Sequence, residues 1–130
     1  MAGSSDVQPL LWLADLDAAM AWYRDTLGCE VTVFGRANDG GVTTCLVSLG
    51  GAGVLLSRDP AMALDGDFGS GHVRLYFHLD TAIERLHDRI RDDADVDVVQ
   101  EPTTQWWGDR TLILRDPWGT LLVFSNPSPT

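Results

Sequence analysis

The chain has 130 residues, of which 45% are hydrophobic and 22% charged, and its formal net charge at pH 7 is −10. This length suits one domain with a substantial core, and no apolar run is long enough to cross a membrane, so we expect a cytoplasmic protein without a membrane partner. The acidic charge argues against a nucleic-acid partner because phosphate groups would be repelled. It favours either a cationic ligand or simply a well-solvated surface.

The first half of the chain has the pattern of a strand, a helix and three more strands. A strand is predicted over residues 7–13, and Asp15 follows at an N-cap position, where its carboxylate can accept hydrogen bonds from the first helical turn. Gly28 is the predicted end of this helix. The apolar residues at helical spacing before it are Leu16, Met20, Tyr23 and Leu27. The next three strands are predicted over residues 29–35, 42–49 and 53–57.

The second half repeats this pattern. A strand is predicted over residues 72–79, and Asp80 is expected to cap a helix whose apolar stripe contains Ile83, Leu86 and Ile90. The strands after this helix are predicted over residues 96–100, 110–114 and 121–124. We therefore predict an α+β fold of two βαβββ modules, about residues 7–58 and 72–126, joined by a linker over 59–71 in a single domain.

Residue alternation predicts a curved mixed sheet with the helices on its outer face and an open cup on the other. In the strand over 72–79, the apolar residues that suit the helix side are Val73, Leu75 and Phe77. The residues between them are His72, Arg74, Tyr76 and His78. This second set is polar or aromatic, which suits a wet or ligand-lined surface. Trp12 falls on the cup side of the first strand by the same alternation.

Tryptophans are concentrated near the end of the chain. Of the five tryptophans, three lie between Trp106 and Trp118, around a turn, a short strand and a second turn. Tryptophan is costly to leave exposed and offers a flat face with one N–H donor. The cluster is therefore either an unusual piece of core or one wall of a site for a flat molecule. Asp109 could serve a cationic group beside it, and Arg74 or Arg110 an anionic group, although either arginine could equally be a salt-bridge partner.

The modules and their motifs resemble the vicinal oxygen chelate superfamily, which includes glyoxalase I, extradiol dioxygenases, fosfomycin-resistance proteins and bleomycin-resistance proteins. The resemblance begins with residues 9–15 leading into Trp22-Tyr23-Arg24-Asp25-Thr26-Leu27-Gly28 and covers nearly the whole chain. Its closing motif, Trp107-Gly108-Asp109-Arg110 through Arg115-Asp116-Pro117-Trp118-Gly119, is most similar to the bleomycin-resistance branch.

The resemblance implies a non-enzymatic protein of the glyoxalase/bleomycin-resistance fold that sequesters a flat aromatic, cationic natural product or antibiotic. It also implies a homodimer in which two chains exchange a terminal strand and both line each ligand groove. The predicted ligand-binding residues are Trp12, Tyr76, His78, Trp106, Trp107, Asp109, Arg110 and Trp118.

Enzymatic members of the superfamily hold a metal with the first residue of each module's opening strand and a glutamate in each module's last strand. The resemblance puts the first pair on Gln8 and His72 and one glutamate position on Val123, and the strand over 53–57 has no glutamate either. A tightly bound divalent ion needs about three protein ligands. We therefore expect no metal and no other cofactor, with Gln8 and His72 as the ligands if a metal binds.

Two enzymatic alternatives stay open. One is a glyoxalase-like or dioxygenase-like metalloenzyme with an atypical ligand set, and the other is a metal-free enzyme that uses the same cup. Nucleophilic catalysis is not indicated, because Ser57, Cys29 and Cys45 have no evident base partner. In a cytoplasmic chain we expect both cysteines to be reduced, buried thiols.

Overall fold

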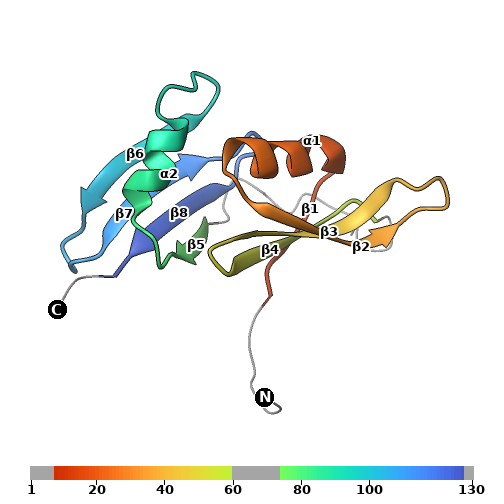
Figure 1. Ribbon diagram of the computed structural model, residues 1–130, viewed down its shortest axis with the longest axis horizontal. Coiled ribbons are helices and arrows are strands. Elements are labelled where there is room, and N and C mark those ends of the chain that lie inside the picture. The colour runs from red at the N-terminus through yellow and green to blue at the C-terminus, as the bar shows by residue number, and fades with distance from the viewer. Residues whose placement is uncertain (1–7, 60–73, 128–130) are drawn as a thin grey trace, which may run out of the picture. The chain divides into compact units, whose positions relative to one another are not determined.

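The computed structural model describes residues 8–59 and 74–127, and these fall into two compact units (Figure 1). The first sheet and its helix consist of β1 (Leu10–Trp12), α1 (Leu16–Ala21), the π-helical turn η1 (Trp22–Thr26), β2 (Glu30–Arg36), β3 (Val42–Leu49) and β4 (Ala52–Ser57). The second sheet and its helix consist of β5 (Arg74–His78), α2 (Ile83–Ile90), β6 (Asp97–Thr104), β7 (Arg110–Arg115) and β8 (Leu121–Asn126). The predicted α+β fold is confirmed, with the mixed sheet present as two four-stranded sheets.

The two sheets share strand order and register. Their orders are β1-β4-β3-β2 and β5-β8-β7-β6, and the first pair in each is parallel. Trp12 lies opposite Ser57 in the first sheet, and His78 lies opposite Ser125 in the second. The residue after each of them donates its backbone N–H to the same serine's carbonyl, at 2.8 Å from Leu13 and 2.9 Å from Leu79. The predicted repeat of pattern is therefore confirmed in strand order and in the register of the parallel pair.

The first helix begins as predicted but continues differently. Asp15 Oδ1 accepts a hydrogen bond from the Ala18 N–H at 3.0 Å, which confirms the N-cap. From Trp22 the helix widens into η1, a turn that adds one residue to the helical repeat and that apolar spacing does not predict. The widened turn keeps Tyr23 and Leu27 buried, at 1% and 2% exposure. Gly28 then ends the helix with a φ of 80°, as predicted.

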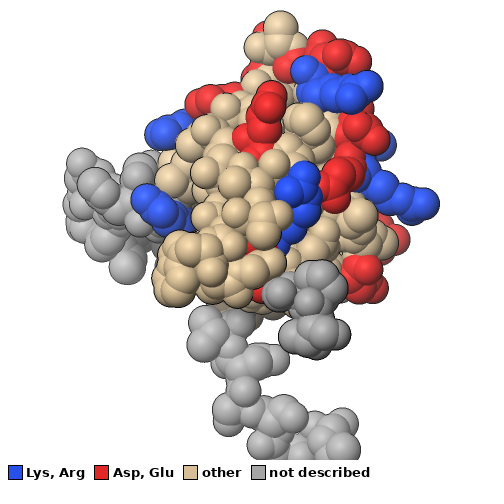
Figure 2. All heavy atoms as spheres, turned by 90° about the vertical axis from the view of Figure 1, so that its left-hand side faces the viewer, with Lys and Arg blue, Asp and Glu red and all other residues tan. Residues whose placement is uncertain are grey.

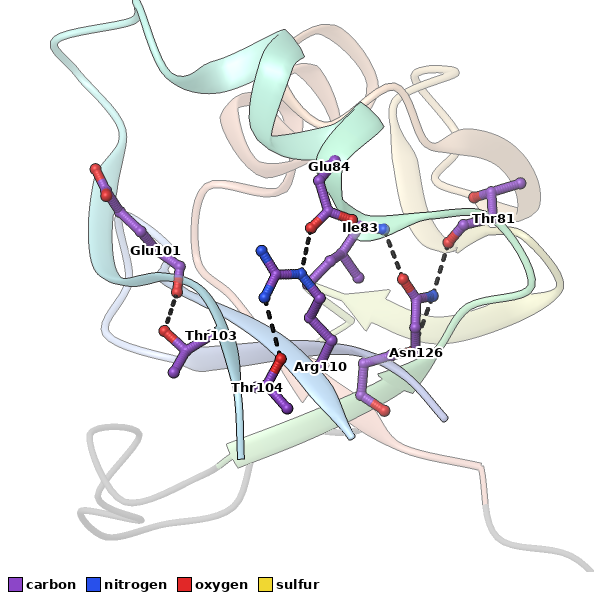
Figure 3. Close-up of polar contacts among 9 residues, drawn as sticks. Thr81, Ile83, Glu84, Glu101, Thr103, Thr104, Arg110 and Asn126 are labelled. Carbon is purple, nitrogen blue, oxygen red and sulfur yellow. Dashed lines mark hydrogen bonds and ion pairs between the residues drawn. The ribbon is translucent and has the colours of Figure 1, made fainter. Parts of the chain in front are cut away.

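The second helix is capped from a distant strand, which corrects the prediction for Asp80. Its N-cap residue is Ala82, and no side chain of its own segment caps it. Instead, Asn126 of β8 accepts the Ile83 N–H at 2.8 Å through Oδ1 (Figure 3). The Asn126 amide nitrogen donates to the carbonyls of Leu79 at 3.1 Å and Thr81 at 2.8 Å. A cap that comes from the other end of the module leaves no local signal for a sequence pattern to detect.

Strand β6 is longer than predicted. It continues through Pro102 to Thr104, and the register shifts between Gln100 and Thr103. Proline is tolerated here because β6 is an edge strand and its missing N–H falls at an irregularity. Strand β1, by contrast, is shorter than predicted, because it has only three residues and begins after Pro9.

Buried side chains lie between each sheet and its helix. In the second sheet Phe77 stacks on Phe124 with ring centroids 5.0 Å apart, on the side covered by α2. The predicted apolar stripe of α2 is buried, with Ile83 at 0% exposure. Cys29 and Cys45 are free and buried, as predicted, and burial raises the pKa of the Cys45 thiol. Within the described residues, no helix combines the length and the apolar character that a membrane crossing needs.

Candidate ligand-binding face of the second sheet

The candidate site lies on the face of the second sheet that is turned away from α2. Residues paired across the strands share this face, because side chains alternate along each strand. Its three rows, each running from β5 through β8 to β7, are His78, Ser125 and Thr111; Tyr76, Val123 and Ile113; and Arg74, Leu121 and Arg115. We call these residues the open face.

Strand β5 presents two stacked rings on the open face. Tyr76 is 54% exposed and His78 is exposed, whereas Phe77 between them is only 4% exposed. The rings of Tyr76 and His78 lie nearly parallel, with centroids 6.4 Å apart and an interplanar angle of 28°. This alternation confirms the predicted cup side for the described part of the strand. Both rings therefore offer exposed aromatic surface on this face.

Hydroxyl and amide groups hold the rest of this end of the face in place. His78 Nδ1 lies 3.2 Å from Ser125 Oγ, which fixes the orientation of the imidazole. Gln105 Nε2 donates to Gln100 Oε1 at 2.9 Å and to Thr111 Oγ1 at 2.7 Å. Ser125 and Thr111 are each only 2% exposed. They therefore position their neighbours, whereas the rings of Tyr76 and His78 are exposed.

The turn between β6 and β7 carries the most exposed tryptophan. Trp106 is 91% exposed and Trp107 is 45% exposed, and their rings meet edge to face with centroids 5.3 Å apart. The side chain of Gln105 ties the start of this turn to Thr111 on the open face. Register places this turn at the same end of the sheet as His78, because Thr111 and His78 belong to one row.

The turn geometry needs glycine but has no need of tryptophan. Gln105 N–H donates to the Asp109 carbonyl at 2.7 Å, and Gly108 N–H donates to the Gln105 carbonyl at 2.9 Å. The same two bonds close the turns over 37–41 and 116–120. The fourth residue of each turn is a glycine with a positive φ, which is 101° in Gly108, 88° in Gly40 and 94° in Gly119. Other residues rarely adopt this conformation. Trp106 and Trp107 are therefore not explained by the turn that holds them.

The remaining predicted tryptophans lie in other settings. Trp12 belongs to the first sheet, where it is 42% exposed and its indole N–H donates to the Asp59 carbonyl at 3.1 Å. Trp118 is half-buried in the turn between β7 and β8. That turn is held by Asp116, which is 2% exposed and accepts the N–H groups of Trp118 at 3.0 Å and Thr120 at 2.8 Å. This buried carboxylate explains why an aspartate stands at the first position of the turn.

Arg110 points to the helix side of the sheet. Its Nε donates to Glu84 Oε2 of α2 at 2.6 Å, and another guanidinium nitrogen donates to Thr104 Oγ1 at 3.2 Å (Figure 3). Of the two roles that the sequence left open, the structure shows the salt bridge. The hydrogen bond from Arg110 holds the pKa of the Glu84 carboxyl below its ordinary value. Asp109 contributes its carbonyl to the adjacent turn.

Comparison with known families decides the classification. A model of the Glyoxalase/Bleomycin resistance protein/Dioxygenase superfamily matches residues 7–124. The chain belongs to this superfamily. No curated protein sequence matches the chain.

Several solved structures of the superfamily's fold are similar over almost the full length. TioX from Micromonospora sp. ML1 has a TM-score of 0.72 at 22% identity, with 97% of this chain and 98% of that chain covered. TnmS3, an antibiotic binding protein from Streptomyces sp. CB03234, has a TM-score of 0.67 at 24% identity, with 98% and 99% covered. Lactoylglutathione lyase from Agrobacterium tumefaciens has a TM-score of 0.64 at 22% identity, with 95% and 94% covered. At these identities the similarity shows the fold alone.

Of the metal positions that the resemblance assigns, Gln8 and Val123 lie within the described residues. The amide nitrogen of Gln8 donates to the carbonyls of Pro9 at 3.2 Å and Gly53 at 3.1 Å. Gln8 stands four residues before Trp12, and the equivalent residue before His78 is Arg74. His72, which we had expected there, lies outside the described residues. A guanidinium repels a cation, and Val123 offers only an alkyl group at 2% exposure.

Elsewhere in the described residues the side chains offer no alternative set of metal ligands. Among residues 8–59 and 74–127, no three side chains of His, Cys, Asp or Glu converge in a way that could hold a metal ion. The side chains of the open face thus do not fit a divalent cation. They fit a molecule bound by ring stacking and by neutral and cationic polar groups.

Proposed function

We propose that this protein binds and sequesters a flat aromatic molecule, such as a natural product or antibiotic, on the open face without transforming it. The observation that carries the proposal is the exposed stack of Tyr76 and His78 on a sheet face whose neighbouring hydroxyls are buried. Stacking an aromatic ring on such a platform contributes about 0.5–1.5 kcal/mol beyond area burial. The exposed Trp106 and Trp107 at the same end of the sheet supply further ring surface.

The comparisons support this proposal without deciding it. TnmS3 is an antibiotic binding protein, but a lactoylglutathione lyase has the same fold, and a fold does not fix a function. The side chains favour binding over a metal-dependent reaction. Of the positions where the resemblance puts metal ligands, Gln8 is engaged with backbone, Val123 has no donor atom in its side chain, and His72 lies outside the described residues.

The homodimer that the resemblance implies stays a prediction. Exposed apolar side chains support it, because such groups at a sheet edge favour pairing with another chain. They lie on the edge strands β2 and β6, where Phe34 is 64% exposed, Val33 38% and Val99 45%.

Calorimetric titration with anthraquinone-2-carboxamide, a neutral planar probe, tests the binding function. We expect saturable binding that weakens about tenfold in Tyr76→Ala, because one stacking partner is lost, and that is retained within about twofold in Tyr76→Phe. His78→Ala is expected to weaken binding as well, whereas the matched control His87→Ala, on α2, is expected to leave it unchanged. If folded Tyr76→Ala and His78→Ala bind as tightly as the unmodified protein, the open face is not the site.

A further inference from the structure

Arg74 stands on the open face in line with the two rings. It is the first residue of β5, and the side chains of Arg74, Tyr76 and His78 alternate with those that face α2. Residues two apart on a strand are separated by about 6.6 Å, so the Arg74 side chain leaves the strand next to that of Tyr76 and is long enough for its guanidinium to reach a group bound beside the ring. Arg74 is exposed, and it forms no ion pair with any acidic residue in the described part of the chain.

Arg115, the other cation of this row, is already neutralised. It is the cross-strand partner of Leu121, which in turn pairs with Arg74. Its Nε lies 3.4 Å from Asp97 Oδ2 of β6. No acidic residue stands in the three rows of the open face on β5, β8 and β7. The uncompensated charge of the open face is therefore positive, although the protein as a whole is strongly acidic.

The net charge of −10 does not set the charge that a bound ligand meets. Acidic side chains pair with arginines elsewhere in the second unit, as Glu84 does with Arg110 and Asp88 with Arg91. On the side of that unit shown in Figure 2, acidic and arginine side chains are interspersed. Exposed charges more than about 10 Å apart are largely screened at ordinary ionic strength. An acidic side chain beyond that distance therefore affects a ligand on the rings less than Arg74 does.

We propose that the ligand is a planar aromatic acid, with its ring system over Tyr76 and His78 and its anionic group bound by Arg74. This inference rests on the proposed binding function and names the class of ligand, in place of the cationic ligand that the net charge favoured. A guanidinium suits the task, because its planar array of N–H donors matches a carboxylate in two parallel hydrogen bonds. The ring stack supplies most of the affinity, and Arg74 supplies the selection by charge.

Three probes of nearly the same shape test which ligand charge the open face prefers. They are anthraquinone-2-carboxylate, anthraquinone-2-carboxamide and 2-(aminomethyl)anthraquinone, and each is titrated by calorimetry at low salt. We expect the carboxylate to bind about fivefold more tightly than the carboxamide, and the amine to bind most weakly. In Arg74→Gln the preference for the carboxylate disappears, while the affinity for the carboxamide stays within about twofold. Arg91→Gln, which removes the same charge from the end of α2, is the matched control and keeps the preference.

The outcomes distinguish the two proposals. If all three probes bind but the carboxylate has no advantage, if the amine binds most tightly, or if Arg74→Gln keeps the full preference, the aromatic acid is wrong and the binding function stands. If none of the probes binds, the binding function itself fails and the inference falls with it. A carboxylate preference that shrinks on raising the salt concentration and on Arg74→Gln supports both.

Discussion

At the scale of the residue, the binding proposal depends on side chains that folding does not require to be aromatic. Tyr76 and His78 occupy strand positions that face away from α2, where the sheet is stable with polar or small residues. Phe77, one position along, is buried against Phe124 and belongs to the core. The alternation of one strand thus separates a residue selected for packing from two that are available for a ligand.

Asn126 offers a residue-scale test of how the second module is held together. Its amide joins the end of β8 to the start of α2 by accepting from Ile83 and donating to Leu79 and Thr81. We expect Asn126→Ala to lower the free energy of unfolding by about 1–3 kcal/mol, because a helix cap and two hydrogen bonds to backbone carbonyls are lost. Urea unfolding followed by circular dichroism measures the loss. Asn38→Ala, in an exposed turn, is the control, and an equal effect of the two changes would refute the role of Asn126.

Residue-scale prediction from the sequence succeeded where the physics is local and failed where it is not. Asp15 lies directly before its helix, so its cap could be read from the sequence. Asp80 has the same local pattern, but tertiary structure gives the capping role to Asn126. Likewise, nothing near Arg110 in the sequence shows that its partner is Glu84, which lies on α2 and precedes Arg110 by 26 residues.

At the scale of the element, the contact between α2 and β7 is electrostatic as well as apolar. The Arg110–Glu84 pair spans the helix and the strand at 2.6 Å, with the side chains 43% and 46% exposed. Because the pair lowers the pKa of Glu84 from its ordinary value of 4.5, its stabilisation is complete above about pH 4.5 and is lost as the pH falls through the lowered value.

The pH dependence of this pair is measurable by a double-mutant cycle of Glu84→Gln and Arg110→Met. We expect a coupling free energy of about 0.2–1 kcal/mol at pH 7, modest because both groups are exposed, and a smaller one at an acidic pH, because protonation of Glu84 removes its charge. Unfolding in urea at low salt gives the four free energies at each pH. A coupling that is the same at both pH values would show that the contact does not depend on the charge of Glu84.

Periodicity predicted most elements and could not predict the irregular ones. Helical and alternating patterns placed both helices and every strand, because these patterns report which face is buried. The π-helical turn η1 and the extension of β6 past Pro102 lie outside such patterns, since both arise from how the element fits its neighbours. The open face was predictable on β5 for the same reason that the core was.

At the scale of the whole molecule, the repeat and the superfamily membership fix the fold, and the proposed function depends on the side chains of one sheet face. Two modules of the same order and register hold different residues at equivalent positions, with Trp12 matching His78 and Gln8 matching Arg74. The net charge suggested a cationic ligand because composition averages over the entire surface. The described open face carries Arg74, which forms no ion pair with an acidic residue of the described chain, and this supports the anionic ligand that we propose.

The most direct test of the central claim is a nuclear magnetic resonance titration of ¹⁵N-labelled protein with anthraquinone-2-carboxylate. If the open face binds a flat aromatic molecule, saturable shift changes concentrate on the amides of β5, β8 and the turn over 105–109, and the Tyr76→Ala variant reduces them. Amides of α2, on the other side of the same sheet, stay unchanged. Shift changes confined to α2, or no saturable change at all, would contradict the account.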